Sequence, residues 1–290
     1  MSDHLSALLG LPTPASHTTK APESSLTPSD FSRVRDLIHQ RAGIFLPEGK
    51  QSMVYSRLSR RLRQTGHRST TSYLRALESG SGAAADSEWQ AFVNCLTTNL
   101  TSFFREQHHF DALADDLRAR RGQPLRIWCC AASTGEEPYS IAMTAVETLG
   151  PQAAVTILAT DIDTQVLAKA ERAVYPITAR GLSTERAQRH FQRGTGRNAG
   201  MLRVRPELQR LVQFRQVNLM GQCWPTGEAF DFVFCRNVMI YFDAATQHSV
   251  LQRLHGVISP GALLYVGHSE NFASASTLFK LRGQTTYVRI

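Results

Sequence analysis

Hydrophobic and polar positions follow two different patterns along the chain. Up to about residue 115 the apolar residues recur at helical spacing. In SMVYSRLSRRLRQTG (52–66), Val54, Leu58 and Leu62 follow at i, i+4 and i+8 and form one face of a predicted helix. Further helices are expected at 72–79 and 87–97, with GSGAAADS (80–87) as a flexible connection between them.

From residue 124 short apolar runs alternate with helical patterns. The runs that predict strands are 124–130, 154–161, 211–218, 230–237 and 261–268, and the helical patterns are near 136–148, 164–173 and 244–258. This alternation predicts an α/β fold, a doubly wound parallel sheet. The final QTTYVRI (284–290) predicts a closing antiparallel strand, and RGTGRNAGMLRVR (193–205) predicts a hairpin with a Gly/Asn turn.

These patterns divide the chain into four parts. The Ser-, Thr- and Pro-rich residues 1–26 are expected to be a disordered tail. An all-helical domain is expected over 27–98, and a linker with a connecting helix over 99–123. The sheet domain then occupies 124–290, with a small β insertion at about 188–212.

Composition narrows the protein class. No apolar run approaches the roughly 20 residues that span a bilayer, and no signal peptide is recognisable. The five cysteines show no CxxC spacing, so we expect reduced thiols in a cytoplasmic protein. We expect no metal site.

The positive charge is unevenly distributed. The net charge is +8, and residues 31–68 contain nine basic and two acidic residues. Arg57, Arg60 and Arg63 follow at i, i+3 and i+6 and form a second face of the helix at 52–66. An acidic partner is expected there, and nucleic acid, an anionic membrane and an acidic protein surface all remain open.

Polar residues follow the predicted strands where an open parallel sheet binds its ligands. Glu136 and Glu137 follow the first strand, Asp161 and Asp163 the second, Asn218 the third, and Arg236 and Asn237 the fourth. Acceptors predominate and a phosphate-binding lysine is absent, so the ligand should offer donors: a cation, an ammonium or ribose hydroxyls. S-adenosylmethionine fits, whereas ATP and NAD bring phosphates.

Each of these residues also has a purely structural interpretation. Glu136 and Glu137 suit the first turn of any helix, and Asp161 and Asp163 suit helix capping. The agreement of four strand ends favours the ligand site.

An ordered series of motifs then resembles the CheR-type chemotaxis receptor methyltransferases. The series is TTNLTSFFRE (97–106), AASTGEEPYS (131–140), ATDIDTQVL (159–167), VNLM (217–220) and FCRNVMIYFD (234–243). EWQAFVNCLTTN, RGTG, GHSENF and RGQTTY extend the resemblance from about residue 30 to the end of the chain.

The resemblance implies transfer of a methyl group from S-adenosylmethionine to receptor glutamates, leaving S-adenosylhomocysteine. It implies a cytoplasmic enzyme whose sheet domain carries a small β-subdomain. It assigns cofactor binding to Asn99, Thr101, Arg105, Glu136, Asp161, Asn218, Leu219, Arg236 and Asn237. Arg105 and Tyr241 would orient the substrate carboxylate, and Arg57, Arg60 and Arg63 would face the receptor's methylation helices.

Two details follow from the resemblance and the chemistry. A glutamate with a pKa of about 4.3 is ionised at neutral pH, so the reaction needs no general base. The β insertion is expected to add a strand to a receptor's C-terminal pentapeptide.

Two other functions compete with this interpretation. A methyltransferase acting on nucleic acid would suit the basic charge, but the segment after the fourth strand reads RNVMIY rather than an Asn/Asp-Pro-Pro-Tyr pattern. A non-enzymatic module that senses S-adenosylmethionine is the second. We expect neither nucleic-acid binding nor membrane insertion.

Overall fold

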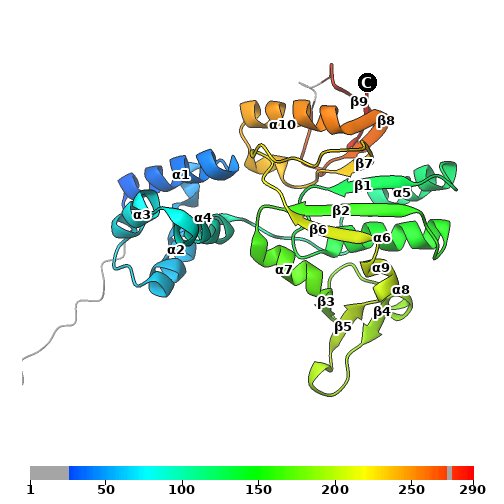
Figure 1. Cartoon of the computed structure of the whole chain (residues 1–290), viewed down its shortest axis with the longest axis horizontal. Coiled ribbons are helices and arrows are strands. Elements are labelled where there is room, and N and C mark those ends of the chain that lie inside the picture. Colours follow the sequence, from blue (N-terminus) through cyan, green and yellow to red (C-terminus); the bar gives the residue numbers. More distant parts are fainter. Residues whose placement is uncertain (1–25, 273–275) are drawn as a thin grey trace, which may run out of the picture.

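A helical domain and a sheet domain lie side by side in the computed structural model, which describes residues 26–272 and 276–290 (Figure 1). The predicted tail lies outside the described residues, apart from Leu26. The elements of the helical domain are α1 (Pro28–Ala42), η1 (Glu48–Lys50), α2 (Gln51–Thr65), α3 (Thr70–Ser79) and α4 (Gly82–Leu96).

The helical domain has a core of its own. Val54, Leu58 and Leu62 of α2 are buried against α1, α3 and α4, as their spacing predicts. The prediction of a flexible connection at 80–87 is wrong, because α4 already begins at Gly82. Three consecutive alanines follow Gly82, and alanine has the highest helix propensity of all residues.

The second domain is built on a seven-stranded sheet in the order β6-β2-β1-β7-β8-β10-β9. The mutually parallel strands are β1 (Leu125–Cys129), β2 (Val155–Asp161), β6 (Val212–Gln216), β7 (Phe230–Phe234) and β8 (Ile258–Tyr265). As predicted, β10 (Thr286–Arg289) pairs antiparallel with β8. β9 (Phe279–Gly283) was not predicted, because only Phe279 of its residues is buried.

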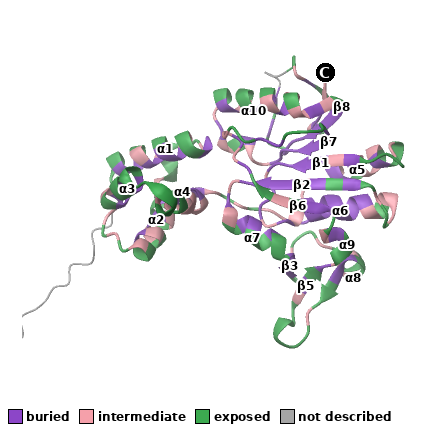
Figure 2. Cartoon of the chain, viewed as in Figure 1, coloured by how far each residue is buried: buried purple, intermediate pink, exposed green. Residues whose placement is uncertain are grey.

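Successive side chains of β1 and of Cys130, which directly follows it, pack alternately into two separate hydrophobic cores. Ile127 and Cys129 belong to the cluster under α5 (His108–Ala119) and α6 (Glu136–Leu149). Trp128 and Cys130 belong to the cluster under α10 (Ala244–Val257). Strands β1 and β7 are therefore buried on both faces over most of their length, and Figure 2 shows them largely in purple.

A small antiparallel sheet projects from the main one (Figure 1). It has the order β3-β5-β4, formed by β3 (Val174–Pro176), β4 (Phe191–Arg193) and β5 (Met201–Val204). Its other elements are α8 (Thr184–His190), η2 (Gly196–Asn198) and α9 (Pro206–Gln209), and α7 (Thr164–Arg172) precedes it. The predicted hairpin is β4–β5, but β3 lies before the predicted start of the insertion at about 188.

Two groups of contacts fix the helical domain against the sheet domain. One is at the end of α1, where Asn218 Nδ2 donates to the Arg41 carbonyl (2.6 Å). Next to it, Gly43 adopts a left-handed conformation (φ 70°), and a Cβ there would lie 2.8 Å from Met220. The other group joins α4 to the end of β2, where Gln90 donates to the Ile162 carbonyl (2.8 Å).

Candidate active site

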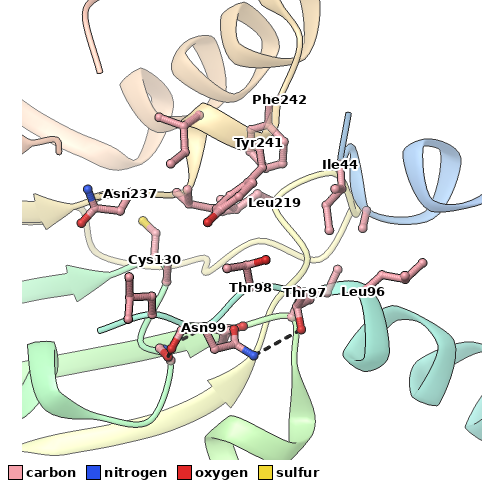
Figure 3. Close-up of a pocket in the computed structure, with 18 of the residues that line it drawn as sticks. Ile44, Leu96, Thr97, Thr98, Asn99, Cys130, Leu219, Asn237, Tyr241 and Phe242 are labelled. Carbon is pink, nitrogen blue, oxygen red and sulfur yellow. Dashed lines mark hydrogen bonds between the residues drawn. The ribbon is translucent and has the colours of Figure 1, made fainter. Parts of the chain in front are cut away.

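A cavity of about 500 Å³ lies between the two domains, at the carboxyl ends of the parallel strands. Strand β1 has β2 on one side and β7 on the other, so the sheet's strand order reverses at this point and leaves a crevice. Figure 3 shows Asn99, Cys130, Asn237 and Tyr241 around it, with Ile44 contributed by the helical domain.

Most of the predicted site residues lie on this one cavity. The sequence-predicted residues on its wall are Arg57, Asn99, Thr101, Arg105, Asp161, Asn218, Leu219, Arg236, Asn237 and Tyr241. Glu136, Arg60 and Arg63 do not line it.

Asp161 and Asp163 have different environments at the end of β2. Asp163 caps α7 through Gln165 N–H (2.8 Å) and also accepts from Asn99 Nδ2 (2.8 Å). Asp161 lies on the cavity wall and accepts backbone N–H bonds from Ser133 (2.8 Å) and Asp163 (2.9 Å). Burial raises the pKa of Asp161 to about 6, because it disfavours the charged form.

The two acids of GEEPYS also have different environments. Glu137 lines the cavity, is buried, and accepts from Arg236 Nη1 and Cys129 Sγ. Glu136 is half-buried; its side chain accepts one bond, from Thr134 Oγ1 (2.6 Å), and its pKa is raised by burial. Glu136, which the sequence predicted to bind the cofactor, therefore lies off the cavity wall. Glu137 lines the cavity but is paired with Arg236.

Arg236 is a buried cation between two carboxylates. Its Nη1 pairs with Glu137, its Nη2 lies 3.3 Å from Glu106 Oε2, and Nη2 also donates to the Arg105 carbonyl. Burial favours the neutral form of Glu106, but the His268 hydrogen bond and the Arg236 charge lower its pKa to about 2. Through its bond to the Arg105 carbonyl, the guanidinium of Arg236 also holds the backbone of Arg105 in place.

Buried His109 adjoins this network without adding a charge. Burial and the nearby Arg236 charge lower its pKa to about 4, so the imidazole is neutral at pH 7. Its Nε2 lies 3.1 Å from the Gln284 carbonyl and 3.0 Å from Thr285 Oγ1.

A buried carboxylate organises the segment that ends at Tyr241. Glu270 accepts backbone N–H bonds from Gly267 (2.5 Å), Asn237 (2.9 Å), Met239 (2.8 Å) and Ile240 (3.3 Å). Asn237 adopts a left-handed backbone conformation (φ 56°), which costs free energy in a residue other than glycine. The three bonds from Asn237, Met239 and Ile240 hold the turn that presents Tyr241 in η3 (Met239–Tyr241).

Arg57 differs from the other two arginines expected on the basic face of α2. Its guanidinium donates to the Leu96 (2.8 Å) and Thr97 (2.7 Å) carbonyls and to Thr98 Oγ1 (3.1 Å). Arg60 and Arg63 are exposed. The expected three-arginine surface is thus corrected to two exposed arginines, since Arg57 secures the segment that carries Asn99 and Thr101.

Comparisons with known proteins identify the family. Residues 29–97 match the family described as CheR methyltransferase, all-alpha domain. Residues 99–288 match CheR methyltransferase, SAM binding domain. The chain belongs to the CheR methyltransferase family. The resemblance noted from the motifs and the predicted fold class are both confirmed, and the CheR chain is an S-adenosylmethionine-dependent methyltransferase.

Curated relatives cover nearly the whole chain. The chemotaxis protein methyltransferase of Escherichia coli (strain K12) is 49% identical over 265 residues, 91% of this CheR chain and 91% of the relative. Chemotaxis protein methyltransferase 2 of Pseudomonas aeruginosa is 50% identical over 269 residues, 91% of this chain and 94% of the relative.

Two features are absent from the part of the chain that the structure describes. No helix in residues 26–272 or 276–290 is long and apolar enough to cross a membrane. The same residues contain no group of three or more His, Cys, Asp or Glu side chains arranged to hold a metal ion.

The sequence analysis missed Glu106 and Glu270 as parts of the site. Both stand in motifs that it quoted, FFRE and GHSENF, but their partners are backbone amides and a buried arginine distant in the sequence. The one signal in the sequence was their place inside these motifs.

Proposed function

We propose that this CheR chain transfers the methyl group of S-adenosylmethionine to glutamate side chains of methyl-accepting chemotaxis receptors. The relatives named chemotaxis protein methyltransferase support this substrate class. The observation that carries the proposal is the joint placement of Arg105 and Tyr241 on a cavity that also contains the acceptor-rich strand ends.

The cavity suits the cofactor in size and in chemistry. Its volume of about 500 Å³ is in the usual range for small-molecule sites, roughly 300–1,000 Å³. Asp161 offers a buried carboxylate to ribose hydroxyls, and Asn218 with buried Leu219 offers polar and apolar contacts to an adenine. When bound, S-adenosylmethionine supplies an electrophilic methyl group and a positive sulfonium.

We assign the cofactor's ammonium to Glu136 and a structural role to Glu137. An ammonium needs a carboxylate with free acceptor capacity. Glu137 is already paired with Arg236, whereas within residues 26–272 and 276–290 Glu136 has one side-chain partner, the Thr134 hydroxyl. Asn99 and Thr101 also contribute to the cavity wall, and Asn99 is held beside the strand ends by its hydrogen bond to Asp163.

The chain's own residues need only to place the glutamate carboxylate and exclude water. No histidine is among the described residues on the cavity wall, and burial raises the pKa of the Cys130 thiol far above neutrality. A carboxylate nucleophile is ionised without help. Arg105 and Tyr241 orient it for in-line attack, and this placement carries the rate enhancement.

Substitution of the two orienting residues tests the proposal. Tyr241→Phe and Arg105→Ala should each lower kcat for methylation of a receptor cytoplasmic fragment by about 10²-fold, because misplacement of reacting groups costs that much. Circular dichroism should show a folded protein, and Arg118→Ala on the exposed face of α5 serves as the matched arginine control. Unchanged turnover in both variants would remove these residues from the mechanism.

The exposed Arg60 and Arg63 of α2 suit an acidic helix of the receptor. The small sheet offers β3 or β4 as an edge strand for an added peptide strand, which supports tethering by a receptor's C-terminal pentapeptide. Calorimetry with such pentapeptides tests the tether, and absence of heat with every sequence would exclude it.

A further inference from the structure

Three exposed apolar side chains surround the mouth of the cavity. They are Phe45 (47% exposed), Leu100 (72%) and Ile240 (47%), and we call them the apolar rim. They belong to three separate segments: the α1–α2 connection, the stretch after α4, and η3. None of them belongs to a hydrophobic core cluster of the described residues.

The rim is attached to the two residues that we assign to the substrate carboxylate. Phe45 N–H donates to the Tyr241 carbonyl (2.7 Å). Ile240 immediately precedes Tyr241, and its N–H is bonded to Glu270 (3.3 Å). The Leu100 carbonyl accepts from Arg105 Nη1 (2.9 Å). The apolar surface is therefore fixed relative to the position of the reacting glutamate.

Exposure of these side chains does not stabilise the fold, because apolar surface contributes to stability only when it is removed from water. A group of exposed apolar side chains around a charged centre is typical of an interaction site. Lys50, Arg57 and Arg105 line the same cavity, and Arg60 and Arg63 lie on the same helix as Arg57. The matching partner combines apolar and acidic side chains on one helical face.

We propose that the apolar rim receives the uncharged side chains that lie one helical turn from the reacting glutamate on an amphipathic, acidic receptor helix. Residues three and four positions away are neighbours on a helix surface, so they reach the rim when the glutamate enters the cavity. The rim selects glutamates whose neighbours at these positions are apolar, because these bury the most apolar surface against it. This inference rests on the proposed function.

Kinetics with rim variants test the inference. The triple variant Phe45→Ser/Leu100→Ser/Ile240→Ser should raise KM for a receptor cytoplasmic fragment about tenfold or more, with kcat changed far less. Its Kd for S-adenosylhomocysteine, measured by calorimetry, should equal that of the wild type. Leu281→Ser on β9, an exposed apolar residue that does not line the cavity, is the control and should leave KM unchanged.

A second arm changes the receptor. Replacing the uncharged residues three and four positions from a methylated glutamate by Gln should raise KM with the wild-type enzyme. The same receptor change should add little with the rim variant, because the two changes remove one contact.

The outcomes separate the inference from the function on which it rests. Wild-type methylation with equal KM in the rim and Leu281 variants overturns the inference alone. Cofactor affinity that falls with the rim variant also overturns it, because the rim is then part of the cofactor site. Absence of receptor methylation by the wild type overturns the proposed function.

Discussion

At the scale of single residues, adjacent acids with the same side chain have different tasks. Glu137 neutralises a buried arginine, whereas Glu136 lies off the cavity wall and accepts a hydrogen bond from the Thr134 hydroxyl. Asp163 caps a helix, and Asp161 lies on the cavity wall. In each pair the neighbouring backbone and charges decide the role.

The glutamate pair gives a prediction that distinguishes binding from structure. Glu136→Gln should weaken binding of S-adenosylmethionine about tenfold, with little change in the free energy of unfolding. Glu137→Gln should instead reduce the free energy of unfolding by about 3 kcal/mol or more, because it removes one partner of a buried ion pair.

Calorimetry and denaturant unfolding of the same two variants measure both quantities. The result that contradicts the assignment is the reverse pattern, with cofactor binding lost in Glu137→Gln at unchanged stability.

At the scale of secondary-structure elements, the conformation of the segment from Arg236 to Tyr241 depends on the loop that contains Glu270. This loop is distant in the sequence and contacts the segment only in the folded chain. Glu270 holds it through backbone N–H groups, and Gly267 allows the close approach, since a Cβ there would lie 2.3 Å from Asn237 Nδ2. The turn is therefore fixed before any substrate arrives.

Glu270→Gln should loosen this turn, because its amide nitrogen cannot accept the N–H bonds that a carboxylate oxygen accepts. We expect kcat to fall about tenfold or more and amide hydrogen exchange at Met239 and Ile240 to accelerate. Glu147→Gln is the matched control, since Glu147 also accepts polar contacts from a second element, through Arg186 and His190 on α8.

The control should lose stability and keep its turnover. Equal activity in the Glu270→Gln and Glu147→Gln variants would mean that the turn does not position Tyr241.

The sequence predicted the elements of the fold well where burial was periodic. The five parallel strands and the closing β10 have continuous or alternating apolar residues, and all were expected. β3 and β9 were not predicted because each buries only one side chain. α4 begins earlier than predicted because three alanines outweigh the flanking glycines.

The site was predictable only for residues at strand ends, which the sheet topology brings together. Asp161, Asn218, Arg236 and Asn237 were found in this way, while Arg105 and Tyr241 came from the family resemblance. The sequence could not predict that the Arg57 side chain points toward the end of α4, because its partners there are backbone carbonyls.

At the scale of the whole molecule, the basic charge has two centres. Residues 174–210, which form the small sheet, contain eight arginines and two glutamates in addition to the basic segment 31–68. The remainder of the chain is net acidic. Both basic regions project from the sheet domain (Figure 1). Of the two, only the segment 31–68 contributes residues to the cavity wall.

Two basic surfaces would also suit nucleic acid, so the most direct test offers both partners. The purified chain is incubated with methyl-labelled S-adenosylmethionine and either a receptor cytoplasmic fragment or RNA, at low and high ionic strength. Arg60→Glu/Arg63→Glu is compared with Lys169→Glu/Arg172→Glu, an equal change of charge at the same spacing on α7.

We expect base-labile label, the signature of a carboxyl ester, on receptor glutamates and none on RNA. The α2 reversal should raise the receptor KM about tenfold at low salt and less at high salt, because salt screens exposed charges. The α7 reversal should have no effect. Base-stable label, or label on RNA with an unmodified receptor, would contradict the account.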